Sequence, residues 1–262
     1  MKNIKRERTL IVSDLHIPDQ DIKTLKLVYK FIDYYHPDKL YILGDLVNFT
    51  KISKYEQDPF YETSVADEIA DAKDVLLEFT TRARKGNPKV EILLFEGNHE
   101  QRMSKFLNKN ASQIATLTCD DELLISVPHI LELKKFGIKW VPYYKIIHEH
   151  NVAFLHGQTV RVKSGFSAHA NIDKFGVSGF TGHTHRLAHV TRTQSGDTKF
   201  WIETGCICNL SPEYPSGLAY ALSPDWTQGF ATIEYDHVLD KVFPTIVPII
   251  NHSFIYSGEL FK

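Results

Sequence analysis

The sequence contains little of what would place this chain outside the ordinary globular proteins. Its three cysteines are too few, and odd in number, for a disulfide framework, and they favour a reducing compartment. No uncharged apolar run reaches the length of a membrane span. The basic segment 1–8 is not followed by an apolar stretch long enough for a signal peptide. Together these absences predict a cytoplasmic protein with no membrane partner.

Neither sign of charge dominates the chain. Lys and Arg total 30 against 32 for Asp and Glu, which gives a formal net charge of −2. No general positive field would therefore attract nucleic acid, although a local basic patch can still do so. With 43% hydrophobic residues over 262 positions, the chain can close a large core. No repeat, low-complexity tract or linker divides it, so we predict a single domain over residues 1–262.

Short apolar runs alternate with helical patterns, which predicts a layered α/β architecture. Helices are expected over residues 22–35, with Asp19 and Asp21 as candidate caps, and over 65–85, before Gly86. Further helices are expected at the start of 101–117 and over 128–136. Strands are expected at 9–13, 40–43 and 90–95, at 138–147 paired with 152–155, and at 177–180, 200–203 and 230–235.

Carboxylate, imidazole and carboxamide side chains gather just after five of the predicted strands. These clusters are Asp14-Leu15-His16, Gly44-Asp45, Gly97-Asn98-His99-Glu100, His156-Gly157 and Gly182-His183-Thr184-His185. In open α/β sheets, ligands bind beyond the carboxyl ends of the strands, where the loops converge. The five clusters are therefore expected to form one site.

The clusters supply nitrogen and oxygen donors but no thiolate. If the backbone stays extended, the side chains of Asp14 and His16 point to one face, and those of His183 and His185 do the same. The donors are Asp14, His16, Asp45, Asn98, His156, His183 and His185. Seven donors exceed the needs of one tetrahedral site but suit two adjacent cations that share a carboxylate. The donor chemistry favours Mn²⁺, Fe²⁺, Co²⁺, Ni²⁺ or Zn²⁺.

In order and composition, the five clusters resemble the sequence blocks of the calcineurin-like metallophosphoesterases, over about residues 9–190. The resemblance implies an α/β fold, a four-layer α/β/β/α sandwich of two mixed sheets flanked by helices. It implies two divalent metal ions per chain, with manganese the first expectation. The first ion would be held by Asp14, His16, Asp45 and His185. The second would be held by Asp45, Asn98, His156 and His183, with Asp45 bridging the two ions.

The resemblance also implies a mechanism. Two cations lower the pKa of a shared water toward about 7, so that the resulting hydroxide can attack phosphorus in line. His99 is the expected acid that protonates the leaving oxygen. Glu100 is expected either to orient a ring nitrogen or to serve as a carboxylate at a helix N-terminus. Asn98 and Arg102 are expected to contact the substrate phosphate.

Two further arginines, Arg161 and Arg186, are weaker candidates for binding phosphate. Cys206 and Cys208 resemble half of a zinc motif, but without a second pair they are expected to line the core. The segments 50–62 and 209–227 are predicted loops. Their aromatic residues either stack substrate bases or pack against the core; these are Tyr55, Phe60, Tyr61, Tyr214, Tyr220 and Trp226.

The second block departs from the protein Ser/Thr phosphatases, which read Gly-Asp-x-Val-Asp-Arg-Gly, because Phe49 stands where they have the arginine. The paired histidines His183 and His185 resemble the phosphodiesterase and nuclease branches. We therefore expect a phosphodiesterase, with nucleic acid or nucleotides as candidate substrates. The alternatives are a phosphomonoesterase for nucleotides or other small esters, a nucleic-acid-binding subunit that needs a partner for cleavage, and a non-catalytic module. The retained ligand positions argue against the last of these.

Overall fold

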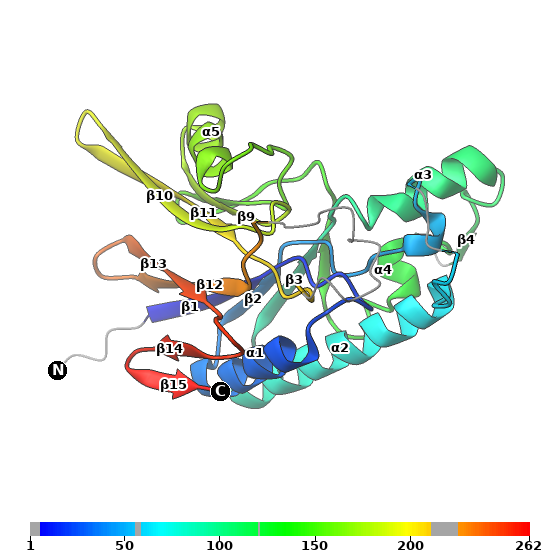
Figure 1. The fold of residues 1–262 in the computed structure, drawn as a ribbon, viewed down its shortest axis with the longest axis horizontal. Helices are drawn as coiled ribbons and strands as arrows, with labels where there is room; N and C mark the ends of the chain where they lie inside the picture. Colours follow the sequence, from blue (N-terminus) through cyan, green and yellow to red (C-terminus); the bar gives the residue numbers. More distant parts are fainter. Residues whose placement is uncertain (1–5, 56–58, 120, 211–224) are drawn as a thin grey trace.

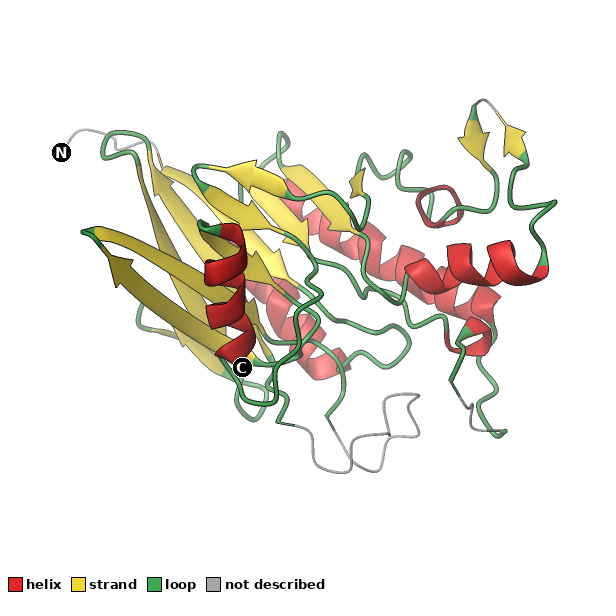
Figure 2. Cartoon of the chain, turned by 90° about the horizontal axis from the view of Figure 1, so that it is seen from above, coloured by secondary structure: helices red, strands yellow, loops and turns green. Residues whose placement is uncertain are grey.

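The computed structural model describes residues 6–55, 59–119, 121–210 and 225–262. Two β-sheets lie face to face, and helices cover their outer faces (Figure 1, Figure 2). One apolar cluster lies between the sheets, and two others lie between each sheet and its helices. This arrangement confirms the predicted four-layer α/β/β/α sandwich of two mixed sheets.

The first sheet carries four parallel strands and an antiparallel hairpin. Its spatial order is β13 (Lys241–Pro248), β12 (Gly229–Asp236), β1 (Arg6–Val12), β2 (Lys39–Ile42), β3 (Glu91–Phe95) and β6 (Lys139–Val141). Strands β1, β2, β3 and β6 run parallel, whereas β12 is antiparallel to both β1 and β13. The carboxyl ends of β1, β2 and β3 therefore meet at one edge.

The second sheet is also mixed. Its order is β10 (Leu187–Gln194), β11 (Asp197–Thr204), β9 (Ser178–Thr181), β8 (Val152–Phe154) and β7 (Ile147–Glu149). Strand β9 is parallel to both of its neighbours, so the loops after β8 and β9 leave the same edge. Two small hairpins complete the strands, β4 (Thr118–Cys119) with β5 (Glu122–Leu123), and β14 (Phe254–Tyr256) with β15 (Glu259–Phe261).

The helices are α1 (Ile22–Tyr35), α2 (Val65–Gly86), α3 (Gln101–Asn110), α4 (Val127–Ile130) and α5 (Phe166–Phe175), with a 3₁₀ turn at Thr50–Ile52. Helix α1 begins where Asp21 accepts the amides of Lys23 and Thr24, both at 2.9 Å. Helix α2 begins with a capping box between Ser64 and Asp67. None of the helices in the described segments is both long enough and apolar enough to cross a bilayer.

The cores follow the alternation of the strands. In β2, Leu40 and Ile42 face helices α1 and α2, whereas Tyr41 faces the second sheet and packs edge-to-face on Phe154 of β8. The outer face of the second sheet is covered by α5, where Phe175 stacks on Trp201. Both sheets are therefore fixed relative to each other by side chains directly below the edge that carries the site.

Several predicted elements need correction. The helix expected over 128–136 is only the four residues of α4, followed by turns through residue 137. The strand expected over 138–147 is two strands, because β6 belongs to the first sheet and only β7 pairs with β8. Asp19 does not cap α1; it is buried, and its carboxylate accepts the side-chain amide of Asn48.

Sequence patterns missed the edge hairpins. Strand β13 alternates half-buried and exposed residues and contains Pro244 and Pro248, which suit an edge strand rather than a central one. Strand β10 is largely exposed, and its pairing with β11 is set by the turn at Gly196 rather than by an apolar face.

A candidate metal centre at the shared sheet edge

The loops that leave the strands use left-handed backbone at the ligand positions themselves. Positive φ values occur at Asp14 (54°), His16 (56°), Asp45 (49°), His183 (67°) and His185 (56°). The extended backbone assumed for the two paired motifs is therefore wrong, and tight turns aim these side chains instead. Strained, non-glycine residues of this kind cost of order 1–3 kcal/mol each and concentrate at functional sites.

Hydrogen bonds between the loops hold these turns together. The amide of Asp14 donates to the carbonyl of Gly44 at 3.0 Å, and that of His16 donates to the carbonyl of Asp45 at 2.9 Å. The carboxylate of Asp14 accepts the amide of His183 at 2.9 Å, and that of Asp45 accepts the amide of His99 at 2.9 Å. The side chains of the site thus also bridge loops from different strands.

Glycines make room for this packing. A Cβ at Gly97 would come within 2.2 Å of Asp45 Oδ1, and a Cβ at Gly182 within 2.4 Å of Asp14 Oδ2. Real Cβ atoms do not approach other atoms so closely. Gly97 and Gly182 are therefore required by close approach, not by a positive φ.

The predicted ligands converge into two groups of metal-binding atoms that share one carboxylate. The first group is Asp14, His16, Asp45 and His185, and the second is Asp45, His156 and His183; within each, the ligand atoms lie within 4.8 Å of one another. Asn98 joins the second group, because its Oδ1 lies 3.1 Å from His156 Nε2. The arrangement brings all seven predicted donors together.

The distances in both groups fit ligands that face a common centre. In the first, His16 Nε2 lies 2.8 Å from His185 Nε2 and 3.8 Å from an oxygen of Asp14 and of Asp45. In the second, His156 Nε2 lies 3.5 Å from Asp45 Oδ1. His156 Nδ1 lies 2.7 Å from the carbonyl of Leu43, which can only accept, so Nδ1 carries a proton and Nε2 is the nitrogen that faces the other ligands. The donor set fits divalent cations.

The electrostatics of the site depend on burial of opposite charges. Burial alone raises the pKa of Asp14, but His185 and the other histidines lower it below the usual carboxyl value. Burial likewise opposes ionisation of Asp45, yet His156 and His99 hold its pKa well below that value. Burial lowers the pKa of His156, but the Asp45 carboxylate outweighs it and raises this pKa to about 9. Both carboxylates are thus ionised and ready to bind cations.

The other three ligand histidines differ: burial lowers the pKa of His185, but the Asp14 carboxylate outweighs it and raises this pKa, whereas His16 and His183 stay neutral. Burial lowers the pKa of His16 to about 4, helped by the charge of His185. Burial also lowers the pKa of His183 to about 4, helped by His156. A neutral imidazole is the form that binds a metal, so the site already holds these two rings in the competent state.

His99, the predicted acid, lies beside the first group. Its ring meets the ring of His16 edge-on at 4.5 Å, and its Nε2 lies 3.9 Å from Asp45 Oδ2 and 2.9 Å from Nη2 of Arg102. Because arginine can only donate, Nε2 is the acceptor and the ring proton is on Nδ1. Burial lowers the pKa of His99 well below its usual value. His99 is therefore a neutral imidazole whose orientation Arg102 helps to fix.

Of the two positions expected for Glu100, the structure shows the second, a carboxylate at the N-terminus of a helix. Glu100 is fully buried at the start of α3, where its carboxylate accepts the amides of Asp45 (2.9 Å), Val47 (3.0 Å) and Gly97 (2.7 Å). These bonds go to backbone amides, which corrects the prediction that Glu100 orients a ring nitrogen. Glu100 instead holds two ligand loops together. Burial, together with the Asp45 charge, raises its pKa to about 7.

The two weaker arginine candidates lie in one loop system. Arg186 donates through its guanidinium to the carbonyls of Arg161 and Val162 and forms an ion pair with Asp225 at 2.8 Å. Arg186 therefore braces the loop that precedes α5, whereas the side chain of Arg161 is exposed. Nothing in these contacts places either guanidinium on a phosphate.

The predicted loop residues have mixed outcomes. Trp226 packs edge-on against the ring of His185 at 4.2 Å, and Tyr61 donates to Glu68 at 3.0 Å. Tyr55 and Phe60 are exposed. Tyr214 and Tyr220 lie outside the described residues. Cys206 and Cys208 are fully buried in a small apolar cluster, which confirms their expected place in the core.

Sequence reasoning missed two polar residues next to the site, Asn48 and Asp19. Asn48 stands in the second block, at the position where the protein phosphatases have their second aspartate, and Asp19 was expected only as a helix cap. Both are buried, and Asn48 contacts His16. Neither position indicates a contact with a ligand histidine, so only the three-dimensional structure identifies it.

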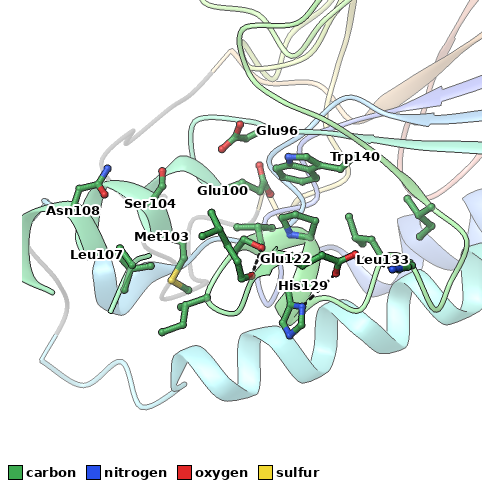
Figure 3. A pocket seen from close by; sticks show the side chains of 18 residues that line it. Glu96, Glu100, Met103, Ser104, Leu107, Asn108, Glu122, His129, Leu133 and Trp140 are labelled. Atoms are coloured by element: carbon green, nitrogen blue, oxygen red, sulfur yellow. Dashed lines mark hydrogen bonds and ion pairs between the residues drawn. The ribbon is translucent and has the colours of Figure 1, made fainter. Parts of the chain in front are cut away.

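A separate cavity of about 690 Å³ lies between α3 and the segment that contains β5 and α4 (Figure 3). Apolar side chains dominate its walls, among them Met103, Leu107, Leu133 and Trp140. Glu100 also lines it, but the metal-binding groups do not. Glu122 at its rim pairs with His129 (3.6 Å) and with Lys134 (3.0 Å). The candidate centre and this cavity are therefore separate, and Glu100 lies between them, because it lines the cavity and accepts the amide of Asp45.

Comparison with known proteins agrees with the family resemblance of the five sequence clusters. The family model of the calcineurin-like phosphoesterases matches residues 7–187. The gene 54 protein of Mycobacterium phage D29 is 28% identical over 266 aligned residues, which cover 98% of this chain and 99% of that protein. Among solved structures, vacuolar protein sorting 29 of Cryptosporidium parvum has a TM-score of 0.50 at 14% identity, covering 98% of both chains. At this identity the last similarity shows the fold alone.

Proposed function

The chain belongs to the calcineurin-like phosphoesterases, and on this premise we propose that it is a phosphodiesterase that uses two divalent cations. The observation that carries the proposal is the position of Asp45. This single buried carboxylate belongs to both groups of ligand atoms, as a residue that bridges two ions must. Manganese is our first choice of metal, with iron, zinc, nickel and cobalt as alternatives that the same donors would accept.

The chemistry of the cations and that of the protein are complementary. Bound divalent cations would supply charge for the phosphoryl oxygens and a water of lowered pKa. The protein would hold them through Asp14, Asp45 and the histidine nitrogens, and its buried loops would limit bulk water around the reacting group. In its imidazolium form, which the negative phosphate of a bound substrate would favour, His99 beside the first group would give a proton to the leaving oxygen. Arg102 holds the His99 ring and can donate to a phosphoryl oxygen next to it.

The preference for a diester rests on the residue that replaces an arginine. Phe49 is fully buried with a left-handed φ of 50°, so this position offers no cation to a second ionised phosphate oxygen. A monoester dianion would therefore lack one of the ligands that protein phosphatases of this family provide. Cyclic nucleotides or nucleic acids are the diesters that we propose as natural substrates.

A substrate screen tests this proposal. After dialysis against chelator, the protein is assayed with Mn²⁺, Zn²⁺, Ni²⁺, Co²⁺ or Fe²⁺. The substrates are bis(4-nitrophenyl) phosphate, 4-nitrophenyl phosphate, cyclic nucleotides, and single- and double-stranded oligonucleotides. We expect metal-dependent cleavage of diesters. Activity that ignores metal contradicts the mechanism, monoesters cleaved far faster than every diester contradict the preference, and salt-dependent oligonucleotide binding without cleavage indicates a binding subunit instead.

A further inference from the structure

One ligand histidine, His16, is held from behind by a buried side-chain amide. Its Nδ1 lies 2.8 Å from Oδ1 of Asn48, while its Nε2 faces His185 in the first group. His16 and Asn48 are both at most 1% exposed, so water cannot replace the contact. Which of the two ring nitrogens carries the proton is therefore decided by the direction in which the Asn48 amide points.

Asp19 fixes that direction. The Nδ2 group of Asn48 donates to Oδ2 of Asp19, which is 2% exposed. Burial raises the pKa of Asp19 to about 7, and in its ionised form the carboxylate can only accept such a bond. The amide nitrogen of Asn48 therefore faces Asp19 and the amide oxygen faces His16. The oxygen can only accept, which makes Nδ1 of His16 the protonated nitrogen. Nε2 then keeps its lone pair on the side where the other ligands converge.

Backbone hydrogen bonds fix the positions of His16, Asn48 and Asp19 relative to one another. The amide of Asp19 donates to the carbonyl of His16 at 2.6 Å, and the amide of Asn48 donates to that of Ile17 at 2.9 Å. Arg102 donates to the carbonyl of Asn48 at 2.7 Å. Neither side chain can rotate away without breaking buried hydrogen bonds. The arrangement has the form of the carboxylate–histidine pairs that orient metal ligands, with one amide inserted between the carboxylate and the ring.

We propose that Asn48 and Asp19 are positioning residues that hold His16 in the Nδ1-protonated tautomer and thereby raise the affinity of the first ligand group for divalent cations. The inference rests on the proposed function, because it assumes that His16 binds a cation. We call the hydrogen bonds from His16 through Asn48 to Asp19 the relay. The direction of these hydrogen bonds, and not the volume of the side chains, raises the affinity for cations.

The polarity can be tested by reversing the relay. In Asn48→Leu the side-chain volume stays similar but the acceptor for His16 is lost. In Asn48→Asp two carboxylates face each other. In the double variant Asn48→Asp with Asp19→Asn, the carboxylate introduced at position 48 accepts from both His16 and the amide introduced at position 19, so the relay is restored with its charge moved by one residue. Asn87→Leu is the matched control, since Asn87 donates to Asp38 at 3.0 Å in a second Asn–Asp pair far along the chain from the ligands.

Two measurements on these variants test the proposal, the affinity for Mn²⁺ and the protonation of the His16 ring. Isothermal titration of the chelator-treated proteins with Mn²⁺ should show binding about 10–100-fold weaker in Asn48→Leu and Asn48→Asp, the usual effect of losing a partner of a metal ligand. The double variant should return to within a few-fold of the wild type, and Asn87→Leu should not differ from it. Nitrogen-15 spectra of the metal-free protein should show His16 protonated at Nδ1 in the wild type and in the double variant.

The outcomes separate this inference from the proposed function. Equal Mn²⁺ affinity in all variants, or a double variant no better than Asn48→Asp, overturns the relay. A His16 ring protonated at Nε2 in the wild type also overturns it. If the wild type binds no divalent cation, the proposed function fails, and the nitrogen-15 spectra alone then decide whether Asn48 sets the tautomer. If Asn48→Leu does not fold, the comparison of the two Asn48→Asp variants still decides.

Discussion

At the scale of the residue, the site combines two buried negative charges with histidines whose protonation differs from one ring to the next. Asp14 and Asp45 stay ionised because histidines surround them, whereas burial keeps His16 and His183 neutral. Folding therefore brings the ligand atoms together before any cation binds. The largest effects of substitution are expected at Asp45, which both groups share.

Replacement of Asp45 by asparagine should remove both cations rather than one. We expect the Mn²⁺ content of the purified protein to fall in both groups and diesterase kcat/KM to drop by at least about 10³-fold, since the charge stabilisation that metals supply is worth several kcal/mol. Metal analysis and steady-state kinetics check this. Asp197→Asn, at an exposed hairpin end, is the control with the same change of charge. A variant that keeps one ion per chain would show that Asp45 does not bridge.

Replacement of His99 by alanine should affect substrates according to their leaving groups. A nitrophenolate needs little protonation, so its diester should lose far less rate than an alkyl or nucleotide diester, for which we expect a loss of about 10²–10⁴-fold. The comparison of kcat for the two substrates in the same preparation is the measurement. Equal losses on both would assign His99 to positioning instead of proton transfer.

The residues of the site were predictable to different degrees. The seven ligands follow strands in the expected order, so parallel pairing brings those of each sheet to one edge, and the packing of the two sheets brings the edges together. The left-handed backbone at Asp14 and the roles of Asn48 and Glu100 did not follow. These depend on contacts such as that between Glu100 and Asp45, which lie 55 positions apart and meet only when β2 and β3 pair. Such contacts leave no pattern in the sequence.

At the scale of the element, helix α1 links the site loop to the core. Its cap Asp21 follows the turn that contains His16 and Asp19, and its apolar side, including Val28 and Phe31, packs below the first sheet. The apolar period of α1 predicted the bounds of this helix, and that of α2 predicted its own to within one residue. Strands β10 and β13 escaped prediction because edge strands need no continuous apolar face.

Replacement of Asp21 by alanine should lower the free energy of unfolding by about 1 kcal/mol at pH 7, the usual cost of an N-cap. Burial raises the pKa of Asp21, but the amide of Thr24 and the side chain of His252 lower it below 3.8. The contribution is thus complete above pH 3.8 and disappears as the pH falls through the lowered pKa of the folded state. Urea unfolding at pH 7 and near pH 3 measures the difference, which should shrink in acid. Asp21→Asn, which still caps, should lose less.

At the scale of the whole molecule, the ligands come from both sheets. Asp14, Asp45 and Asn98 follow β1, β2 and β3 of the first sheet, whereas the histidines of the last two clusters follow β8 and β9 of the second. The packing of side chains such as Tyr41 and Phe154 between the sheets, together with hydrogen bonds such as that from the amide of His183 to Asp14, sets the distance between these halves. Cations bound at this edge would therefore link the two sheets, in addition to their chemical role.

Because the cations would link the two sheets, we expect metal to raise the thermal stability of the protein. A cation that binds only the folded protein, at 100 times its dissociation constant, stabilises it by about 2.7 kcal/mol. For a chain of this size that free energy corresponds to a rise in Tm of roughly 5–10 °C. Calorimetry with Mn²⁺ and with chelator measures the shift, which should disappear in Asp45→Asn. Because Trp140 lies in the first sheet and Trp201 in the second, variants that keep only one of the three tryptophans should report the same transition from either sheet. A metal-dependent shift confined to one of these probes would mean that the cations stabilise one sheet alone.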